Sequence, residues 1–301
     1  MTKIVAVIVT YNPPGDLLTR VSAVIGQVSK LIIVDNGSEP ATQDILKNAA
    51  AQFSDRLELI SNGKNKGLAV ALNQGIKSAT KQEDVEWVLL LDHDSQPQSG
   101  MIARMLETYN SHSDKENIGI IAPEILDKNT SSPTKYLVPI GKVLWFKRIA
   151  LNTKYNDEVL SVITSGSMIR TDMFGKIGMM PEHFFIDYID HYFCLGIKRR
   201  GYKILLVKDT ILQHELGEKT EHNLLGVRVG TTNHSPTRRF YIFRNRIWVW
   251  KEYIMTFPNF VMHDLLAAWF DIFRVTLFEN QKISKLTAIM RGILAGLRQE
   301  P

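Results

Sequence analysis

The sequence predicts an α/β fold built on a mostly parallel sheet with helices on both faces. Short apolar runs rich in Val, Ile and Leu, at residues 4–9, 31–34 and 87–91, alternate with helix-like segments of ten or more residues. Each run passes directly into polar residues: TYN, DNGS and DHDS. This alternation is typical of βαβ units, whose parallel strands are buried on both faces. Ligands of such sheets bind beyond the carboxyl ends of the strands, so we expect a site there.

The remaining elements follow in chain order. Helices are predicted at residues 16–28, 41–53 and 68–80, and LELIS at 57–61 is a fourth strand. IGIIAP (118–123) is a further strand, SVITSGSMIRTDMFGKIG (161–178) a strand, a turn and a short helix, DYIDHYFCLGIKRRG (187–201) a helix, and YKILLVKDTILQH (202–214) a strand pair or one bent strand. From residue 235 onward the chain is helical and aromatic-rich, with an interruption at Pro258. The last segment, 282–299, alternates basic and apolar residues at helical spacing.

Composition narrows the class of protein. The chain has 301 residues, of which 45% are hydrophobic, which is enough for a substantial core. Its one cysteine, Cys194, excludes an internal disulfide and a cysteine-based zinc site, which suits a reducing compartment. The first apolar run is shorter than the core of a secretory signal, and no stretch reaches the roughly 20 apolar residues of a spanning helix. We therefore expect a cytoplasmic protein.

Charge is distributed unevenly along the chain. Residues 1–195 hold 19 basic and 22 acidic residues, whereas residues 196–301 hold 17 and 9. The basic C-terminal third indicates an anionic partner, such as a phosphate or a membrane surface. The acidic balance of the rest and the lack of a nucleic-acid-binding motif argue against a nucleic acid.

Two of the early motifs suggest a nucleotide pocket. Asp35 ends a hydrophobic strand and begins a DNGS turn, so it is either a turn residue or an acceptor for a nucleobase N–H or a sugar hydroxyl. NKGLAVALNQGI (65–76) begins a helix after a glycine, where an anion is favoured. The spacing of a P-loop is missing, and no strand leads into GxGxxG, so neither of those nucleotide-binding motifs is present.

The tandem aspartates of LLLDHDS are the strongest candidate for a metal site. On an extended strand, residues two apart point to the same side, so Asp92 and Asp94 would present their carboxylates to a common point. Two unit charges about 4 Å apart repel by roughly 4 kcal/mol at an effective dielectric near 20. A divalent cation offsets such repulsion, and Mg²⁺ prefers one or two carboxylates together with substrate phosphates. The alternation also predicts that His93 points away from the site.

A second acidic pair and one histidine complete the candidate site. Asp187 and Asp190 precede a basic segment, where they are either helix-start residues or, beside a metal-bound phosphate, a general base toward an acceptor hydroxyl. His214, after the last strand, is the histidine best placed to reach the same edge of the sheet.

The ordered set VTYN, IIVDNGS, NKGLAVALNQGI, LLLDHDS, FFIDYID and LQHELG resembles the family-2 inverting glycosyltransferases of the GT-A fold. The later block RRFYIFRNRIWVWKEY is similar to the tail of their bacterial rhamnosyltransferase members. The resemblance spans about residues 3–255. It implies a glycosyltransferase domain at 1–235, with a nucleotide-binding half at about 1–115 and an acceptor half at about 116–235, followed by a helical extension at 236–301.

The resemblance also implies roles for individual residues. Asp92 and Asp94 would be the family's DxD motif, with Asp94 the more direct ligand of a Mg²⁺ or Mn²⁺ ion that also contacts the donor's diphosphate. Asp190 would be the catalytic base, with Asp187 as a possible partner in that role, and His214 a second metal ligand or a diphosphate contact. The expected contacts to the nucleotide-sugar are Thr10, Tyr11, Asn12, Asp35, Asn65, Lys66, Gly67, Asp92, Arg244 and Asn245.

The sequence departs from the family pattern in two places. Gly196 stands where the family commonly has an arginine, with Lys198, Arg199 and Arg200 just beyond it. Ile189 stands before Asp190, where many members have Glu. The choice between Asp187 and Asp190 as the base therefore stays open at this point.

The tail resemblance implies dTDP-rhamnose as the donor and a saccharide or lipid-linked saccharide as the acceptor, as in synthesis of cell-surface polysaccharide. A UDP-sugar donor is the alternative within the family. A nucleotidyltransferase is disfavoured because VTYNPPGD lacks a basic, glycine-rich loop, and a non-catalytic sugar-nucleotide-binding protein because the acidic set is complete. The basic, aromatic C-terminus is either a helical cap over the site or a surface that lies on the inner face of the cytoplasmic membrane.

Overall fold

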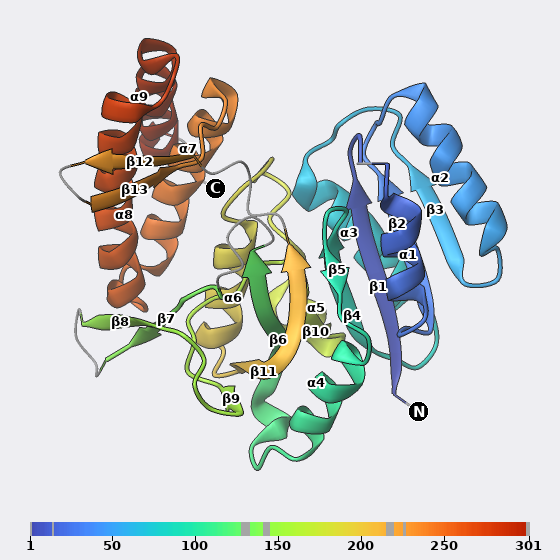
Figure 1. Ribbon diagram of the computed structural model, residues 1–301. Helices are drawn as coiled ribbons and strands as arrows, with labels where there is room; N and C mark the ends of the chain where they lie inside the picture. The colour runs from blue at the N-terminus through green and yellow to red at the C-terminus, as the bar shows by residue number, and fades with distance from the viewer. Residues whose placement is uncertain are drawn as a thin grey trace.

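We describe residues 2–13, 15–127, 133–140, 145–214, 220–224 and 227–298 in a computed structural model of the chain. A central sheet runs in the order β3-β2-β1-β4-β10-β6-β11-β5, and β9 pairs with β11 outside this path. The pairs β1–β2, β2–β3, β1–β4 and β6–β11 are parallel. The predicted mostly parallel α/β sheet is thus confirmed, and Figure 1 shows the N-terminal helices and the C-terminal helices at opposite ends of it.

The N-terminal half is a series of βαβ units. Its elements are β1 (Lys3–Thr10), α1 (Leu17–Ile25), β2 (Lys30–Asp35), α2 (Pro40–Gln52), β3 (Leu57–Ser61), α3 (Leu68–Thr80) and β4 (Val85–Asp92). Strands β1, β2 and β4 are buried on both faces, as expected for apolar runs between helices, whereas β3 at the edge of the sheet is half-buried. Thr10 is in register with Asp35, and Val9 with Asp92, so the polar ends of β1, β2 and β4 meet at one edge. Helix α3 can approach β1 closely because Gly75 has no side chain, and an added β carbon would overlap Val7.

The second half adds antiparallel strands to the sheet. Its elements are β5 (Gln96–Pro97), α4 (Met101–Asn110), the 3-10 helix η1 (Lys115–Asn117), β6 (Ile118–Asp127), β9 (Tyr155–Asn156), β10 (Met168–Arg170), α5 (Asp172–Ile177), α6 (Ile189–Arg199) and β11 (Lys203–His214). Strand β10 is antiparallel to both of its neighbours, β4 and β6. Strand β11 is one bent strand, because its register with β6 shifts between Val207 and Ile211.

The expected strand at the start of the 161–178 segment is wrong. Residues 161–164 form no strand, and a turn at Ser165 and Gly166 comes before β10. Gly166 has φ +87°, and an added β carbon would lie 2.8 Å from the side chains of Leu212 and Pro123. This tight turn reverses the chain, so only Met168–Arg170 remain to pair with β4 and β6.

Three helices follow the sheet: α7 (Pro236–Tyr253), α8 (Pro258–Phe278) and α9 (Lys282–Arg298). Ser235 caps α7 by accepting a hydrogen bond from the Arg238 amide, and Pro236 and Pro258 open α7 and α8 at positions that need no amide donor.

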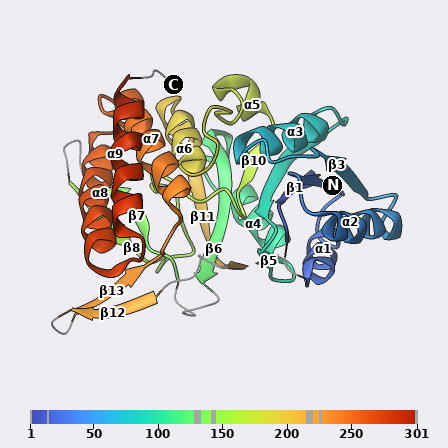
Figure 2. The same cartoon turned by 90° about the horizontal axis from the view of Figure 1, so that it is seen from above.

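Figure 2 shows these helices packed together at one end of the molecule, beside two hairpins, β7 (Tyr136–Pro139) with β8 (Phe146–Ile149) and β12 (Thr220–Leu224) with β13 (Val227–Thr231). Gly292 lets α9 lie directly on α7, since an added β carbon would be 2.5 Å from the Phe240 carbonyl oxygen.

Within the described ranges, every helix is too short or too polar to cross a membrane.

Candidate active site

A cleft of about 650 Å³ opens at the edge of the sheet where β1, β2 and β4 end. One wall carries Tyr11, Asn36 and Asn65, from the ends of β1 and β2 and the start of α3. The opposite wall is the segment 185–191 together with the first turns of α7. The cleft therefore lies at the carboxyl ends of the parallel strands, where the sequence predicts a site.

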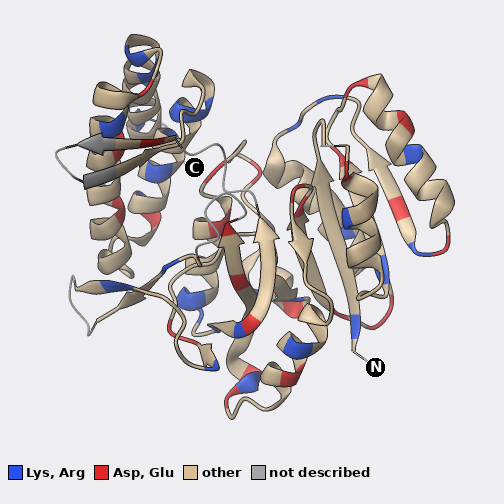
Figure 3. Cartoon of the chain, in the orientation of Figure 1, with Lys and Arg blue, Asp and Glu red and all other residues tan. Residues whose placement is uncertain are grey.

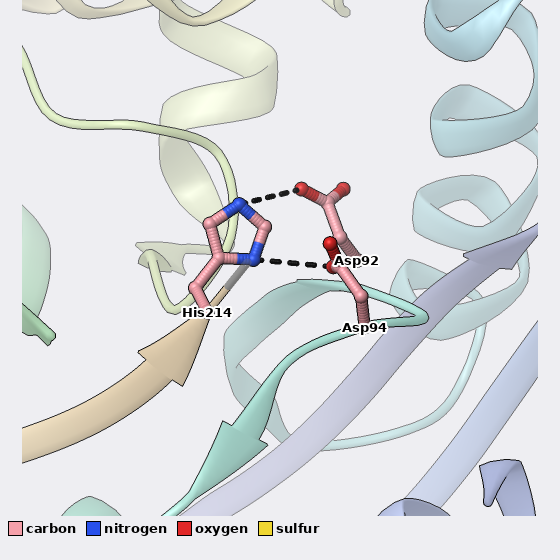
Figure 4. A group of neighbouring side chains, drawn as sticks. All are labelled: Asp92, Asp94 and His214. Carbon is pink, nitrogen blue, oxygen red and sulfur yellow. Dashed lines mark ion pairs between the residues drawn. The ribbon is translucent and has the colours of Figure 1, made fainter. Parts of the chain in front are cut away.

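Two carboxylates and an imidazole meet on the floor of this cleft (Figure 4). Nδ1 of His214 lies 3.1 Å from Oδ1 of Asp94, and Nε2 of the same ring lies 3.8 Å from Oδ2 of Asp92. One ligand atom from each residue can be chosen so that all lie within 4.8 Å of one another. The sequence separates His214 from Asp92 by more than 120 residues, and the pairing of the end of β11 with β5, the short strand that directly follows the aspartate motif, brings them together.

The two aspartates converge through a turn and not through strand alternation. Strand β4 ends at Asp92, and His93 and Asp94 form a turn closed by a hydrogen bond from the Ser95 amide to the Asp92 carbonyl (3.1 Å). Arg20 of α1 donates to the Asp94 carbonyl and holds this turn from behind. The expectation that His93 points away from the site is wrong, because the period of two stops at the strand end and His93 lines the cleft.

Two buried serines support the cluster. Oγ of Ser165 accepts from the Asp92 amide (3.1 Å) and lies 2.6 Å from Oγ of Ser95. Oγ of Ser95 in turn lies 2.9 Å from Nδ1 of His214. These contacts hold the imidazole and the carboxylates in one arrangement. Of the LQHELG motif, the residues after His214 lie outside the described ranges.

The cluster perturbs the pKa of each of its members. Burial raises the pKa of Asp92; His214 opposes this rise, and the charges of Asp94 and Asp190 add to it. Burial also acts to raise the pKa of Asp94, but contact with His214 outweighs it, so that pKa lies below its ordinary value. For His214, burial lowers the pKa, yet the contacts with Asp94 and Asp92 raise it overall. The cluster thus favours a positive charge beside its carboxylates and disfavours the state in which both carboxylates are ionised without a cation.

The second acidic pair lies on the opposite wall, and its two members have different surroundings. Asp187 has φ +64° and accepts hydrogen bonds from Nε and an Nη of Arg238 at 3.0 and 2.9 Å. Asp190 is in the first turn of α6, and its carboxylate accepts from the His191 amide (2.8 Å). Both line the cleft, but among the described residues no basic side chain forms an ion pair with Asp190.

Only part of the predicted nucleotide contacts reach the cleft. Tyr11, Asn65 and Asp92 line it. The carboxylate of Asp35 is fully buried and accepts from Oγ1 of Thr10 (3.1 Å) and from Oγ of Ser38 (2.5 Å), so it holds the turn after β2. The geometry of Asp35 is therefore that of a turn residue, the first of the two alternatives for the DNGS motif.

The loop before α3 is tied to β2 through one asparagine. Nδ2 of Asn36 donates to Oδ1 of Asn65 (3.0 Å) and to the Gly67 carbonyl (3.2 Å), and its Oδ1 accepts from the Lys66 amide (3.0 Å). Gly67 has φ +92° and packs against Phe185 of the opposite wall. Asn12 accepts from the Glu39 amide through its side chain. Asn12, Lys66 and Gly67 thus support the cleft and do not line it.

Arg244 and Asn245, which the sequence predicts to face the diphosphate or the acceptor, lie behind the 183–188 segment. Asn245 is fully buried, and its Nδ2 donates to the carbonyls of Ile186 (2.8 Å) and Asp187 (3.0 Å). Arg244 donates to the His183 carbonyl (2.8 Å) and lies over the ring of Trp248. Both residues therefore shape the acidic wall through its backbone.

The sequence predictions miss several residues that line the cleft, among them Asn36, His234 and Arg238. Asn36 follows Asp35 directly, and the strand-end rule that singled out Asp35 applies equally to it. Arg238 is in the same RRFYIFRNR block as Arg244, but composition could not tell which arginine of a helix faces the cleft. For His234, burial and then the charges of Arg238 and Arg239 lower the pKa to about 4, so it is neutral at pH 7.

The donor set fits a divalent cation. Two carboxylates and one imidazole on one side of a cleft are ligands that suit Mn²⁺, and the carboxylates suit Mg²⁺. Burial raises the pKa of Asp92, and the opposing effect of His214 does not cancel that rise. Asp92, Asp94 and His214 are the residues that would hold the ion, and Ser95 and Ser165 would orient them.

Several known proteins are similar to the chain in sequence. The sequence profile described as Glycosyl transferase family 2 matches residues 5–178. The chain is 28% identical over 311 residues to the dTDP-rhamnosyl transferase RfbF of Shigella flexneri, covering 98% of this chain and 95% of RfbF. It is 27% identical over 207 residues to the low-salt glycan biosynthesis hexosyltransferase Agl10 of Haloferax volcanii, covering 66% of this chain and 62% of Agl10.

Two solved structures show the same fold at low sequence identity. GalNAc-T7 with UDP, GalNAc and Mn²⁺ superposes with a TM-score of 0.62 at 14% identity, over 87% of this chain and about half (50%) of its own. The mannosyltransferase PcManGT from Pyrobaculum calidifontis, in complex with GDP-Man and Mn²⁺, gives 0.57 at 14% identity, over 99% and 76%. Together with the profile match over more than half of its length, these likenesses show that the chain belongs to glycosyl transferase family 2 and has the GT-A fold.

Proposed function

We propose that the protein transfers L-rhamnose from dTDP-rhamnose to a hydroxyl of a saccharide or lipid-linked saccharide in cell-surface polysaccharide synthesis, with inversion at the anomeric carbon. The observation that carries the proposal is the cleft itself, where the Asp92–Asp94–His214 cluster faces Asp190 from the opposite wall. The donor is inferred from the likeness to the dTDP-rhamnosyl transferase RfbF, which extends over nearly the whole chain.

Asp190 is the proposed catalytic base. It lines the cleft, its charge reaches Asp92, and it has no ion-pair partner among the described residues. Its carboxylate would take the proton of the acceptor hydroxyl as that oxygen attacks the anomeric carbon from the face opposite the diphosphate. A single displacement inverts the configuration, so the enzyme needs no nucleophile of its own. Asp187 is paired with Arg238, which supports a role for it in holding the wall and not in catalysis.

The cluster on the floor is the proposed diphosphate site. Asp92, Asp94 and His214 would hold Mg²⁺ or Mn²⁺, which when bound stabilises negative charge on the departing nucleoside diphosphate. The relatives GalNAc-T7 and PcManGT were solved with Mn²⁺, which supports this assignment. Tyr11, Asn36 and Asn65 would contact the nucleoside, on a frame held by Thr10, Asn12, Asp35, Lys66 and Gly67. Arg238 is the arginine that faces the cleft, and Arg244 and Asn245 would act on the site through the loop.

A thermal-shift series tests the function. The purified protein is heated with dTDP-rhamnose, UDP-glucose, UDP-galactose or GDP-mannose, each with and without Mn²⁺, because a ligand of the native state raises the melting temperature. We expect the largest shift with dTDP-rhamnose plus Mn²⁺. A larger shift with a UDP-sugar would replace the donor, and the lack of any metal-dependent shift would contradict the glycosyl-transfer proposal.

A variant pair links the shift to the cluster. Asp94→Ala is expected to lose the metal-dependent part of the shift, whereas the matched control Asp55→Ala, at an exposed position after α2, is expected to keep it. An equal loss in both variants would show that the cluster takes no part in donor binding.

A further inference from the structure

Helix α8 turns an apolar face to the solvent. Its exposed large side chains are Leu266, Trp269, Phe270, Phe273 and Leu277, at a spacing that places them in one stripe along the helix. Trp269 is 67% exposed and Phe273 41%. A contiguous apolar face of this kind on a folded protein indicates an interaction surface.

The acidic residues of α8, Asp264 and Asp271, point the other way, into the protein. Asp264 accepts from Oη of Tyr188 (2.8 Å) and from Nε1 of Trp250 (2.8 Å), and both Asp264 and Asp271 pair with Arg246 of α7 at 3.1 Å. This network fixes the rotation of α8 about its axis, because turning the apolar stripe inward would carry both carboxylates away from Arg246 and leave that buried cation unpaired. The outward apolar stripe is therefore the arrangement that the packing of α8 enforces.

The neighbouring helix α9 adds positive charge to the same end of the molecule. Ile283, Met290, Leu294 and Leu297 are exposed on α9. Within residues 258–298, all of which the structure describes, the exposed charged side chains are Lys282, Arg291 and Arg298, Arg274 is half-exposed, and the acidic residues are buried. Nζ of Lys282 donates to the Leu277 carbonyl, which places a cation at the end of the α8 stripe. Figure 3 shows basic positions along these C-terminal helices.

We propose that the exposed sides of α8 and α9 bind the surface of an anionic lipid membrane. Apolar and aromatic side chains interspersed with Lys and Arg are typical of helices that lie in the headgroup region, with the apolar face buried about 5–10 Å deep. A second copy of the chain fits this surface less well. A two-fold contact sets the same patch against itself, so it would bring the three cations together without an acidic partner.

The surface extends the proposed function without depending on it. Helix α7 contributes Arg238 and Ile242 to the cleft and packs on α8 and α9 through other residues, and none of the exposed residues of α8 and α9 named above lines the cleft. A membrane-bound enzyme meets a lipid-linked acceptor directly. Vesicle binding is measured without donor or metal, so its failure is distinguishable from failure of the glycosyl-transfer proposal.

Co-flotation with vesicles tests the proposal. The full chain is mixed with vesicles of phosphatidylcholine alone or with about 30% phosphatidylglycerol, at low salt and at about 0.5 M NaCl. We expect binding to the anionic vesicles that weakens at high salt. The double variant Trp269→Ser/Phe273→Ser and the double variant Lys282→Glu/Arg291→Glu are each expected to weaken binding about tenfold or more. Ile45→Ser and Lys47→Glu, at exposed positions of α2, are the matched controls and are expected to bind as the parent does.

Trp269 also reports its own insertion. Lipids brominated in the acyl chain should quench part of the tryptophan emission, and Trp269→Phe should remove that quenching while retaining binding. Absence of binding to anionic vesicles would overturn the proposal, as would equal weakening by the α2 controls. A dimer in sedimentation velocity that dissociates on Trp269→Ser would overturn it too, because the face would then belong to a second copy.

Discussion

The guanidinium group of Arg238 forms a two-pronged ion pair with the carboxylate of Asp187, with N–O distances of 3.0 and 2.9 Å. The two residues are 51 positions apart, one at the start of α7 and the other in the segment before α6. The pair joins the C-terminal helices to the wall of the cleft and leaves Asp190 as the cleft carboxylate without a basic partner among the described residues.

Removal of the two carboxylates in turn should separate their roles. Asp190→Asn is expected to lower the transfer rate about 10²–10⁴-fold with little change in donor affinity, because it removes a general base and keeps the shape. Asp187→Asn should cost less in rate, since an amide still accepts one hydrogen bond from Arg238. Initial rates with dTDP-rhamnose and calorimetric donor affinities check both. The reverse ranking would make Asp187 the base.

Ser165→Ala should weaken metal binding although Ser165 is not a ligand. Its Oγ holds the Asp92 amide and the Ser95 hydroxyl, and loss of such an orienting contact typically costs about 10–100-fold in metal affinity. Titration calorimetry with Mn²⁺ measures the change, and Ser54→Ala at an exposed position serves as the control. Equal affinities in the parent and both variants would contradict the proposed support for the cluster.

Asn245→Ala should affect turnover more than donor binding. The substitution leaves the Ile186 and Asp187 carbonyls without their buried donor, at a cost of about 1–3 kcal/mol in the free energy of unfolding. The segment that precedes Asp190 would then lose its fixed position, so kcat should fall while the KM for the donor changes little. Urea unfolding and steady-state kinetics test this, with exposed Asn48→Ala as the control. A rise in donor KM alone would place Asn245 in donor binding.

His234 should make the folded protein sensitive to acid. Burial and the charges of Arg238 and Arg239 lower its pKa to about 4 from the ordinary 6.5, although Asp187 and Asp271 oppose that shift. Between these two values the unfolded chain binds a proton that the folded chain does not, so this residue lowers stability as the pH falls from 6.5 toward 4. The free energy of unfolding of His234→Gln, measured in urea, should therefore fall less than that of the parent between about pH 7.5 and about pH 5.

A direct titration complements that comparison. The ring-proton signal of His234 in NMR should have its midpoint well below the ordinary 6.5. A midpoint at or above 6.5 would show that the two arginines do not act on this imidazole as the structure indicates.

Much of the cleft could be predicted because apolar runs and their polar ends are local signals. The buried runs that became β1, β2 and β4 locate the edge of the sheet, and a parallel arrangement brings their ends together whatever the details. Asp92 and Asp94 could be singled out as candidate metal ligands from the repulsion between their charges. The side on which His93 lies could not, because it depends on where β4 stops and the turn begins.

Local sequence patterns could not predict the contacts between segments that are distant in the sequence. RRFYIFRNR contains arginines at neighbouring helical positions, and only the packing of α7 decides that Arg238 faces the cleft while Arg244 and Asn245 hold the 183–188 backbone. The sequence likewise could not predict that α8 turns its aspartates inward and its aromatic side chains outward. A helix that contains both kinds of residue could pack with either face toward the protein.

The sequence by itself determined the parallel α/β sheet, the edge that carries the site and the acidic residues of that site, since these follow from periodicity along the chain and from the cost of placing like charges together. Only the tertiary structure decided which residues pair around the cleft, that Asp35 holds a turn and that α8 exposes its apolar face. These depend on how elements far apart in sequence rotate and pack against one another, and a one-dimensional pattern carries no information on that rotation.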